Sequence, residues 1–129
     1  MFAQEVREFI AANQDKNLAE FVQPLEKALT NLEELTALVI DRSKTNPNEI
    51  GAASVEYLHV FGYTVYGYMW ARMAKAALAR LDGDSDGFYA AKLGTGRFFI
   101  KRLLPRIHSP SEAVRAGSEP LFELDAAQF

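Results

Sequence analysis

Three aspartates between two helical stretches have the spacing in this chain that is closest to a metal site. Asp82, Asp84 and Asp86 alternate with glycine and serine in DGDSDG, as in the first half of an EF-hand loop, whose carboxylates wrap Ca²⁺. The second half of such a loop is missing, because its twelfth position falls on Leu93, where a bidentate glutamate is required. We therefore predict a tight turn in which Asp84, Ser85 or Asp86 caps the next helix. A calcium-binding helix-loop-helix is the weaker alternative.

A second pair of residues suggests metal chemistry that the rest of the chain does not complete. Glu56 and His59 have the Glu-x-x-His spacing that ferritin-like bundles use for two metal ions, together with a second such pair and two further glutamates. The only other histidine, His108, has Pro105 three residues before it. The absence of cysteine excludes a disulfide, a thiolate zinc site and a cysteine nucleophile. We expect no catalytic, metal-binding or cofactor-binding residue in this chain.

A basic segment follows the aspartates and contains no acid. Its cations are Lys92, Arg97, Lys101, Arg102 and Arg106. They could stabilise the negative C-terminal end of a helix, or form a docking strip for an acidic partner or a phosphate. Arg97 and Lys101 are one turn apart and share a helix face. The whole chain has 14 basic and 17 acidic residues, a net charge of −3, which gives nucleic-acid binding no overall electrostatic help. We expect no nucleic-acid partner.

Length and composition predict one folded domain. The chain has 129 residues, of which 49% are hydrophobic and 12% aromatic, enough for one core and too apolar for a disordered segment. The uncharged stretch from Val60 to Ala71 is well short of the roughly 20 residues that span a bilayer. The first ten residues lack the apolar region of a signal peptide. We expect no membrane span and a cytoplasmic location.

The periodicity that must position these residues is helical almost everywhere. A short helix is expected over residues 2–12, and a long one over residues 18–40 with Pro24 near its start. Apolar steps of four and three define one seam of the long helix, with one polar interruption: Leu18, Val22, Leu25, Leu29, Leu32, Thr36 and Val39. A turn cluster with Pro47 ends it.

The next helix is expected over residues 48–81 and is apolar around most of its circumference. One apolar stripe comprises Ala52, Val55, Leu58, Gly62, Val65, Met69, Met73 and Ala76, and aromatic residues widen it. Such a helix is usually central and contacted on several sides. Each glycine inside it, Gly62 and Gly67, lowers helix stability by about 1 kcal/mol relative to alanine. We expect these glycines to let a backbone or a ring approach closely.

Two further helices complete the predicted fold. One should run over residues 88–104 and end at Pro105. The other should begin at a capping box of Ser109, Pro110 and Glu112 and end near Gly117. No strand pattern or internal repeat is visible. We predict an all-α fold, an antiparallel four-helix bundle of up-down type with a short extra N-terminal helix.

The aromatic residues exceed what a thin bundle easily buries, which suggests an interaction surface on the second and third long helices. The candidate residues are Tyr57, Phe61, Tyr68, Trp70, Arg97, Phe98 and Lys101. In the alternative, a stand-alone helical module binds an apolar ligand or partner, and four of the aromatics line its pocket: Phe61, Tyr68, Trp70 and Phe98. Ordinary core positions are a third explanation for these rings.

Four segments of the chain resemble the C-terminal helical extension of bacterial acyl-CoA dehydrogenases. They are AASVEYLHVFG at 52–62, GYMWARMA at 67–74, FYAAKL at 88–93 and RFF at 97–99. The early EVREFI segment and the amphipathic 18–40 helix extend the resemblance to nearly the whole chain. Gly94 and Gly96 depart from the small alanine-like residues expected there. No catalytic or flavin-contacting residue of the family can be carried over to this sequence.

The resemblance implies a bundle appended to a flavin-binding core. That core removes hydrogens from the α and β carbons of an acyl-CoA, with a carboxylate base and FAD as the hydride acceptor. The chain is too short to contain it, so we expect residues 1–129 to be one helical domain from the C-terminus of a larger dehydrogenase of fatty acid metabolism. FAD would belong to the parent enzyme, and this chain alone would not be an enzyme. The expected partners are the catalytic core and a second subunit in a homo-oligomer, and the domain could wall the acyl-chain end of the site.

Overall fold

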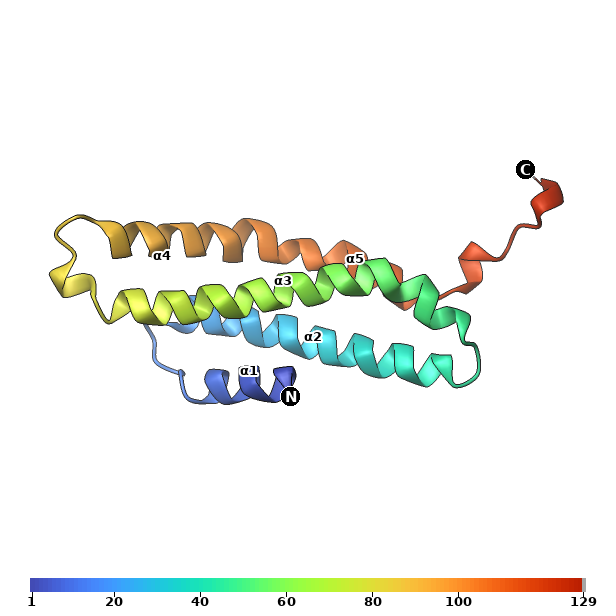
Figure 1. Ribbon diagram of the computed structural model, residues 1–129, viewed down its shortest axis with the longest axis horizontal. Coiled ribbons are helices and arrows are strands. Elements are labelled where there is room, and N and C mark those ends of the chain that lie inside the picture. Colours follow the sequence, from blue (N-terminus) through green and yellow to red (C-terminus); the bar gives the residue numbers. More distant parts are fainter. Residues whose placement is uncertain (129) are drawn as a thin grey trace.

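The helical periodicity forms five α-helices within residues 1–128, the part of the chain that this computed structural model describes (Figure 1). Their bounds are α1 Phe2–Ala11, α2 Ala19–Ser43, α3 Asn48–Leu78, α4 Phe88–Phe98 and α5 His108–Ala116. The long helices α2 and α3 lie side by side and antiparallel, with α4 and α5 along one side of α3 and α1 on the other (Figure 1). No strand occurs in residues 1–128. The predicted all-α antiparallel bundle with a short N-terminal helix is confirmed.

Helix α2 buries most of the predicted seam. Five of its seven positions are buried: Leu18, Val22, Leu25, Leu29 and Leu32. Phe21, Ala28 and Leu35 extend the buried face. The polar interruption at Thr36 is satisfied, because its hydroxyl donates to the carbonyl oxygen of Leu32 at 2.7 Å and pairs with the Tyr57 hydroxyl at 2.7 Å. The spacing of apolar residues therefore predicts this helix well, because it has only one apolar side.

Helix α3 faces the core with residues other than the predicted stripe. Its buried positions are mostly small: Ala53, Val60, Thr64, Gly67, Tyr68, Ala71, Ala74 and Ala77. Val55 and Leu58 of the stripe are 59% and 65% exposed. The reason is close helix packing, because a side chain at Gly67 would lie 3.5 Å from Leu104 and 3.7 Å from Leu25. Apart from Val60 and Tyr68, the buried residues of α3 are thus small, and the large side chains Val55, Leu58, Met69 and Met73 of the predicted stripe are exposed.

The last two predicted helices lie end to end in one rod (Figure 1). After α4 the chain continues as the π-helix η2 (Phe99–Leu103) and the 3₁₀ helix η3 (Leu104–Ile107), and then enters α5 without a loop. The prediction that Pro105 ends the helix is wrong, because Pro105 falls in the first turn of η3, where a missing N–H is tolerated. The predicted capping box is also wrong. Ser109 follows residues that are already helical, and no side-chain cap forms at the start of α5.

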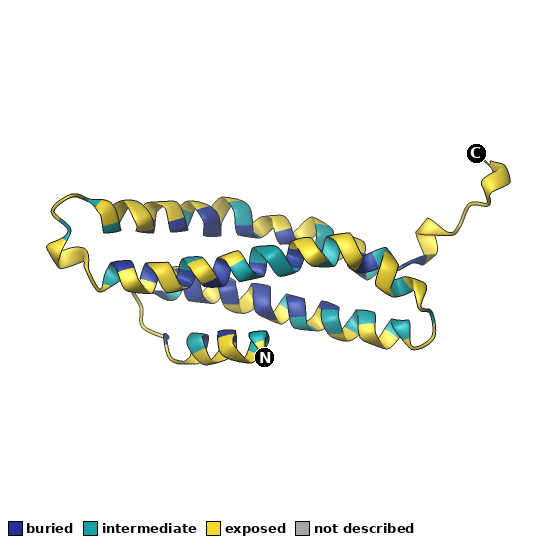
Figure 2. Cartoon of the chain, viewed as in Figure 1, coloured by how far each residue is buried: buried dark blue, intermediate teal, exposed yellow. Residues whose placement is uncertain are grey.

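Buried positions lie where α2, α3 and the α4–α5 rod face one another, and exposed positions cover the outer sides (Figure 2). The predicted end near Gly117 is confirmed, since α5 stops at Ala116. The following segment, residues 119–128, is exposed and projects away from the bundle (Figure 2). It contains the short 3₁₀ helices η4 (Glu119–Leu121) and η5 (Ala126–Gln128). Two clusters of apolar side chains form the core, a larger one around Phe21 and a smaller one around Leu35.

Candidate functional site

Two of the candidate surface residues belong to the interior. Tyr68 is 4% exposed, and its ring lies 5.4 Å from that of Phe9, edge to face. Its hydroxyl donates to the Glu5 carboxylate at 2.8 Å. Burial, and after it this carboxylate, raises the pKa of Tyr68. Trp70 is half-buried and stacks on Phe99 at 6.4 Å. Both side chains fix α3 against its neighbours and offer little surface to a partner.

Tyr57 and Phe61 lie in an apolar cleft between α2 and α3, near the turn that joins them. Its volume is about 640 Å³, and its lining is Thr36, Val39, Ile40, Ile50, Ala53, Ser54, Tyr57, Leu58 and Phe61. At one end the Phe61 ring contacts Phe2 of α1, with ring centroids 5.3 Å apart. Of the four aromatics that the ligand-binding alternative placed in one pocket, this cleft contains Phe61 and none of the other three.

Arg97, Phe98 and Lys101 lie close together on the α4–α5 rod. The Arg97 Nε donates to the Glu20 carboxylate of α2 at 2.8 Å. Phe98 is 57% exposed and Lys101 is exposed. We call the exposed group Phe98, Lys101, Arg102 and Arg106 the basic face. Within residues 1–128 none of its three cations has an ion-pair partner within 4.0 Å.

The aspartate loop starts a helix. The Asp84 carboxylate accepts the backbone N–H of Ala90 in the first turn of α4 at 2.8 Å, which confirms the predicted cap. The Ser85 hydroxyl donates to Asp86 at 2.6 Å, and Gly87 takes the positive φ of 72° that the turn requires. In the described part of the chain, no three histidine or acidic side chains come together as metal ligands, neither here nor around Glu56. His59 lies on the surface.

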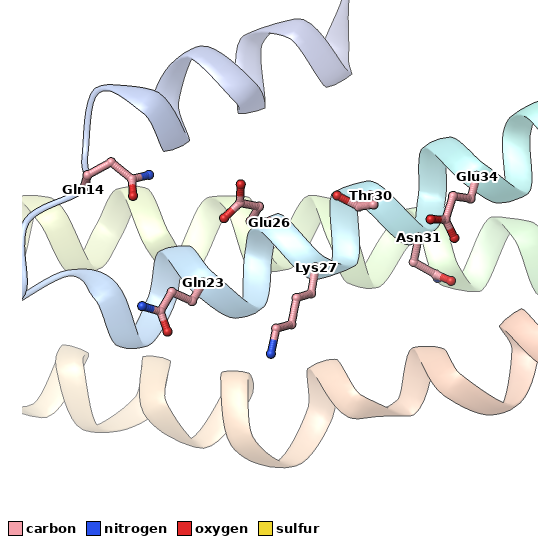
Figure 3. A pocket seen from close by; sticks show the side chains of 7 residues that line it. All are labelled: Gln14, Gln23, Glu26, Lys27, Thr30, Asn31 and Glu34. Carbon is pink, nitrogen blue, oxygen red and sulfur yellow. The ribbon is translucent and has the colours of Figure 1, made fainter.

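A polar hollow lies along the outer side of α2, where no functional residue was predicted (Figure 3). Its volume is about 610 Å³, and its lining is Gln14, Gln23, Glu26, Lys27, Thr30, Asn31 and Glu34. Figure 3 shows Glu26 and Lys27 pointing to opposite sides of α2. Asn31 donates to the Ser111 hydroxyl at 2.8 Å and accepts from Arg115 at 3.0 Å, so it joins α2 to α5. The hollow lacks the apolar lining that ligand pockets usually have.

Sequence reasoning also missed the buried polar contact between Glu49 at the start of α3 and Ser118 after α5. No signal in the sequence marks it, because the two residues are 69 positions apart. It closes the end of the bundle at which the α2–α3 turn lies.

Within residues 1–128, no helix combines the length and apolarity needed to cross a membrane. Residues 2–125 match the protein family described as acetyl-CoA dehydrogenase C-terminal like. The chain is also similar to the broad-specificity linear acyl-CoA dehydrogenase FadE5 of Mycobacterium tuberculosis. The two are 31% identical over 115 residues, which cover 81% of this chain and 19% of that protein. The chain thus spans about a fifth of the length of this curated relative. With the family matched over nearly its whole length, the chain belongs to the acyl-CoA dehydrogenase C-terminal-like domain family.

Proposed function

We propose that this chain is the non-catalytic C-terminal helical domain of an FAD-dependent acyl-CoA dehydrogenase, and that it packs on the catalytic core of that enzyme. The lengths support this division, because the matched region makes up 19% of the relative and leaves most of that protein for a catalytic core. In this proposal the core holds FAD, which accepts the hydride, and acts in the cytoplasm in fatty acid metabolism. The residues of this chain supply a docking surface.

The basic face is the observation that carries the proposal. Phe98 is 57% exposed and has the exposed cations Lys101 and Arg102 beside it. An exposed apolar side chain rimmed by charge is the usual form of a docking site. Two copies of this face would repel each other, so an acidic patch of the catalytic core is the better partner. The ion pair of Arg97 with Glu20 anchors α4 to α2 and holds the face in place.

Binding between this chain and a flavin-bound catalytic core lacking its own C-terminal domain tests the proposal. Lys101→Glu and Phe98→Ser should each weaken binding at least about tenfold in titration calorimetry. Lys44→Glu makes the same charge change just after the end of α2, beside the α2–α3 turn and away from the face, and serves as the matched control. Arg97 is left intact because its reversal would also place two carboxylates together at Glu20.

The expected controls separate docking from folding and from catalysis. Helical circular dichroism should be the same for all variants, since the altered side chains are exposed. The chain alone should carry no flavin absorbance and dehydrogenate no acyl-CoA. A yellow purified chain, or a Lys101→Glu variant that binds the core as the unaltered chain does, would contradict the proposal.

The apolar cleft supports a second candidate, a wall for the acyl-chain end of the site or a seat for another apolar ligand. Its lining is almost entirely hydrocarbon, and its volume of about 640 Å³ lies within the usual range of ligand pockets. A fluorescent long-chain fatty acid should bind the chain, and Ile50→Asp in the cleft should abolish that binding. Leu121→Asp changes a leucine of similar exposure outside the cleft and should have no effect. Equal binding of the fatty acid by both variants would exclude the cleft as its binding site.

A further inference from the structure

The outer side of α3 carries a row of large apolar side chains that the rest of residues 1–128 leaves largely exposed. We call Gly51, Val55, Leu58, Gly62, Tyr66, Met69 and Met73 the outer stripe. Val55, Leu58 and Tyr66 are 59%, 65% and 61% exposed. Helix α2, the α4–α5 rod and α1 lie along the other sides of α3, which leaves this side open (Figure 1).

Nothing in residues 1–128 packs closely against the glycines of the stripe. A side-chain carbon at Gly51 or Gly62 would meet nothing within 4 Å. Gly96 differs, because a side chain there would lie 2.9 Å from Phe21. A glycine inside an exposed helix lowers stability by about 1 kcal/mol relative to alanine, so Gly62 is unfavourable in the isolated bundle. Close approach of another helix would explain a glycine at this position, because glycine has no side chain to keep the two backbones apart.

The stripe is symmetric in sequence about Gly62. Moving outward in either direction, the stripe residues follow at steps of four, three and four. If two α3 helices pack antiparallel about a two-fold axis at Gly62, Leu58 lies opposite Tyr66 of the second copy. Val55 then lies opposite Met69, and the small Gly51 lies opposite the large Met73. Such self-complementarity is the condition for a two-fold interface between identical chains.

The charges of α3 favour the same arrangement. Glu56 lies in its N-terminal half and Arg72 in its C-terminal half. The other two charges of α3 are engaged within the chain, Glu49 by Ser118 and Lys75 over the ring of Phe9. Antiparallel packing places the acidic half of one helix along the basic half of the other, whereas parallel packing would bring like charges together. Unlike the basic face, the stripe itself is uncharged and can therefore meet its own copy without repulsion.

We propose that the outer stripe of α3 is a two-fold interface with a second copy of this chain, in which the two α3 helices pack antiparallel and cross at Gly62. The contact runs about 33 Å along the helix at 1.5 Å per residue. One helix pair is at the small end of stable interfaces, so the isolated chain should exchange between monomer and dimer. The proposal uses a different face from the docking of the catalytic core and does not depend on it.

Single introduced cysteines test the register, because the chain contains none of its own. In the proposed packing Gly62→Cys lies on the two-fold axis, so the two introduced cysteines face each other. Their Cα atoms should then be about 4.4–6.8 Å apart, the separation that a disulfide requires. Val55→Cys lies seven residues from the axis, so its two copies stand about 20 Å apart. Oxidation should cross-link Gly62→Cys to itself and leave Val55→Cys monomeric. A mixture of Val55→Cys and Met69→Cys should cross-link.

Sedimentation tests the interface without cysteines. Leu58→Asp should raise the dimer dissociation constant at least about tenfold with unchanged helical circular dichroism, because this side chain is exposed in the bundle. Leu121→Asp alters a leucine of similar exposure in the tail and is the matched control. Lys101→Glu should leave the dimer intact, which separates this interface from core docking.

Three outcomes would overturn the proposal. A chain that sediments as a monomer at about millimolar concentration has no such interface. Self-cross-linking of Val55→Cys would show parallel packing or non-specific contact. Loss of the dimer on Leu121→Asp, but not on Leu58→Asp, would assign the dimer to the tail.

Discussion

One carboxylate oxygen of Glu49 accepts two hydrogen bonds from Ser118, which lies 69 residues later in the chain. The Ser118 hydroxyl donates to Oε1 at 2.6 Å and its backbone N–H donates to the same oxygen at 3.1 Å. Ser118 is 2% exposed and the Glu49 side chain 13%. Asn46 donates to the Ser118 hydroxyl oxygen at 3.0 Å. These contacts fasten the end of α5 to the first turn of α3 and close one end of the bundle.

This contact should make stability depend on pH. The two bonds from Ser118 lower the pKa of Glu49 below its ordinary value of 4.5. A carboxylate with a lowered folded-state pKa stabilises the fold above that ordinary value, and the contribution is lost as pH falls through the lower pKa. Glu49→Gln should therefore lower the melting temperature at neutral pH, and the difference should shrink as the pH falls below 4.5. Glu123→Gln, in the exposed tail, is the control. A difference that stays constant with pH would contradict this explanation.

Two glycines of α4, separated by one residue, should respond to alanine with opposite changes in stability. At Gly96 a side-chain carbon would lie 2.9 Å from Phe21 and 3.2 Å from Trp70, two aromatic rings held by packing. At Gly94 it would meet nothing within 4 Å. Gly96→Ala should lower the free energy of unfolding by about 1–3 kcal/mol through overpacking. Gly94→Ala should raise it by up to about 1 kcal/mol through helix propensity. Urea denaturation measures both changes. Shifts of the same sign would show that the close contact with Phe21 and Trp70 does not determine the effect of Gly96→Ala.

The bond between Tyr68 and Glu5 fastens α1 to α3. Tyr68→Phe removes it and should lower the free energy of unfolding by about 1–2 kcal/mol. Because the folded-state pKa of Tyr68 is raised above its ordinary value of 10.0, its contribution holds below that pH and is lost at higher pH, as the tyrosine ionises. The difference in absorbance between the unaltered chain and Tyr68→Phe should show a tyrosinate step above pH 10.0. A step below that value would place Tyr68 on the surface.

The buried side of α2 could be predicted from the sequence, whereas the buried side of α3 could not, for a physical reason. The seam through Leu25 and Leu29 is the one apolar side of α2, so the spacing alone decides which side is buried. Helix α3 is apolar on two sides, and the side of small residues around Gly67 faces the core because neighbours can approach it closely. Spacing cannot choose between two apolar sides. Burial of Tyr68 follows from that choice: a core position was one of the explanations left open by the sequence, and the structure selects it.

The α4–α5 rod shows a second limit. Pro105 is a reliable stop signal in a regular α-helix. Here the π-helix η2 and the 3₁₀ helix η3 change the hydrogen-bond register before it, so that Pro105 lies in a first turn. Such register changes depend on packing against α3 and leave no local pattern. The basic face was visible in the sequence because its cations recur without acids, a feature that folding does not alter.

The cap at α4 supports a last prediction, which also tests calcium binding. Asp84 accepts the Ala90 N–H at 2.8 Å, whereas no hydrogen bond or ion pair in residues 1–128 uses the Asp82 side chain. Asp84→Ala should therefore lower the free energy of unfolding by about 1 kcal/mol, and Asp82→Ala should leave it nearly unchanged.

Calcium should not alter this pattern. With the glutamate of an EF-hand replaced by Leu93, the loop lacks its bidentate ligand, so millimolar calcium should leave the melting temperature of the unaltered chain where it was. A site with a Kd of about 10 μM would instead stabilise the fold by about 2.7 kcal/mol at a hundredfold excess, a shift that thermal denaturation resolves easily. A calcium-dependent rise in melting temperature that both aspartate variants abolish would show a metal site in the loop. In that case the aspartates would act together as ligands, and Asp84 would not act alone as a cap.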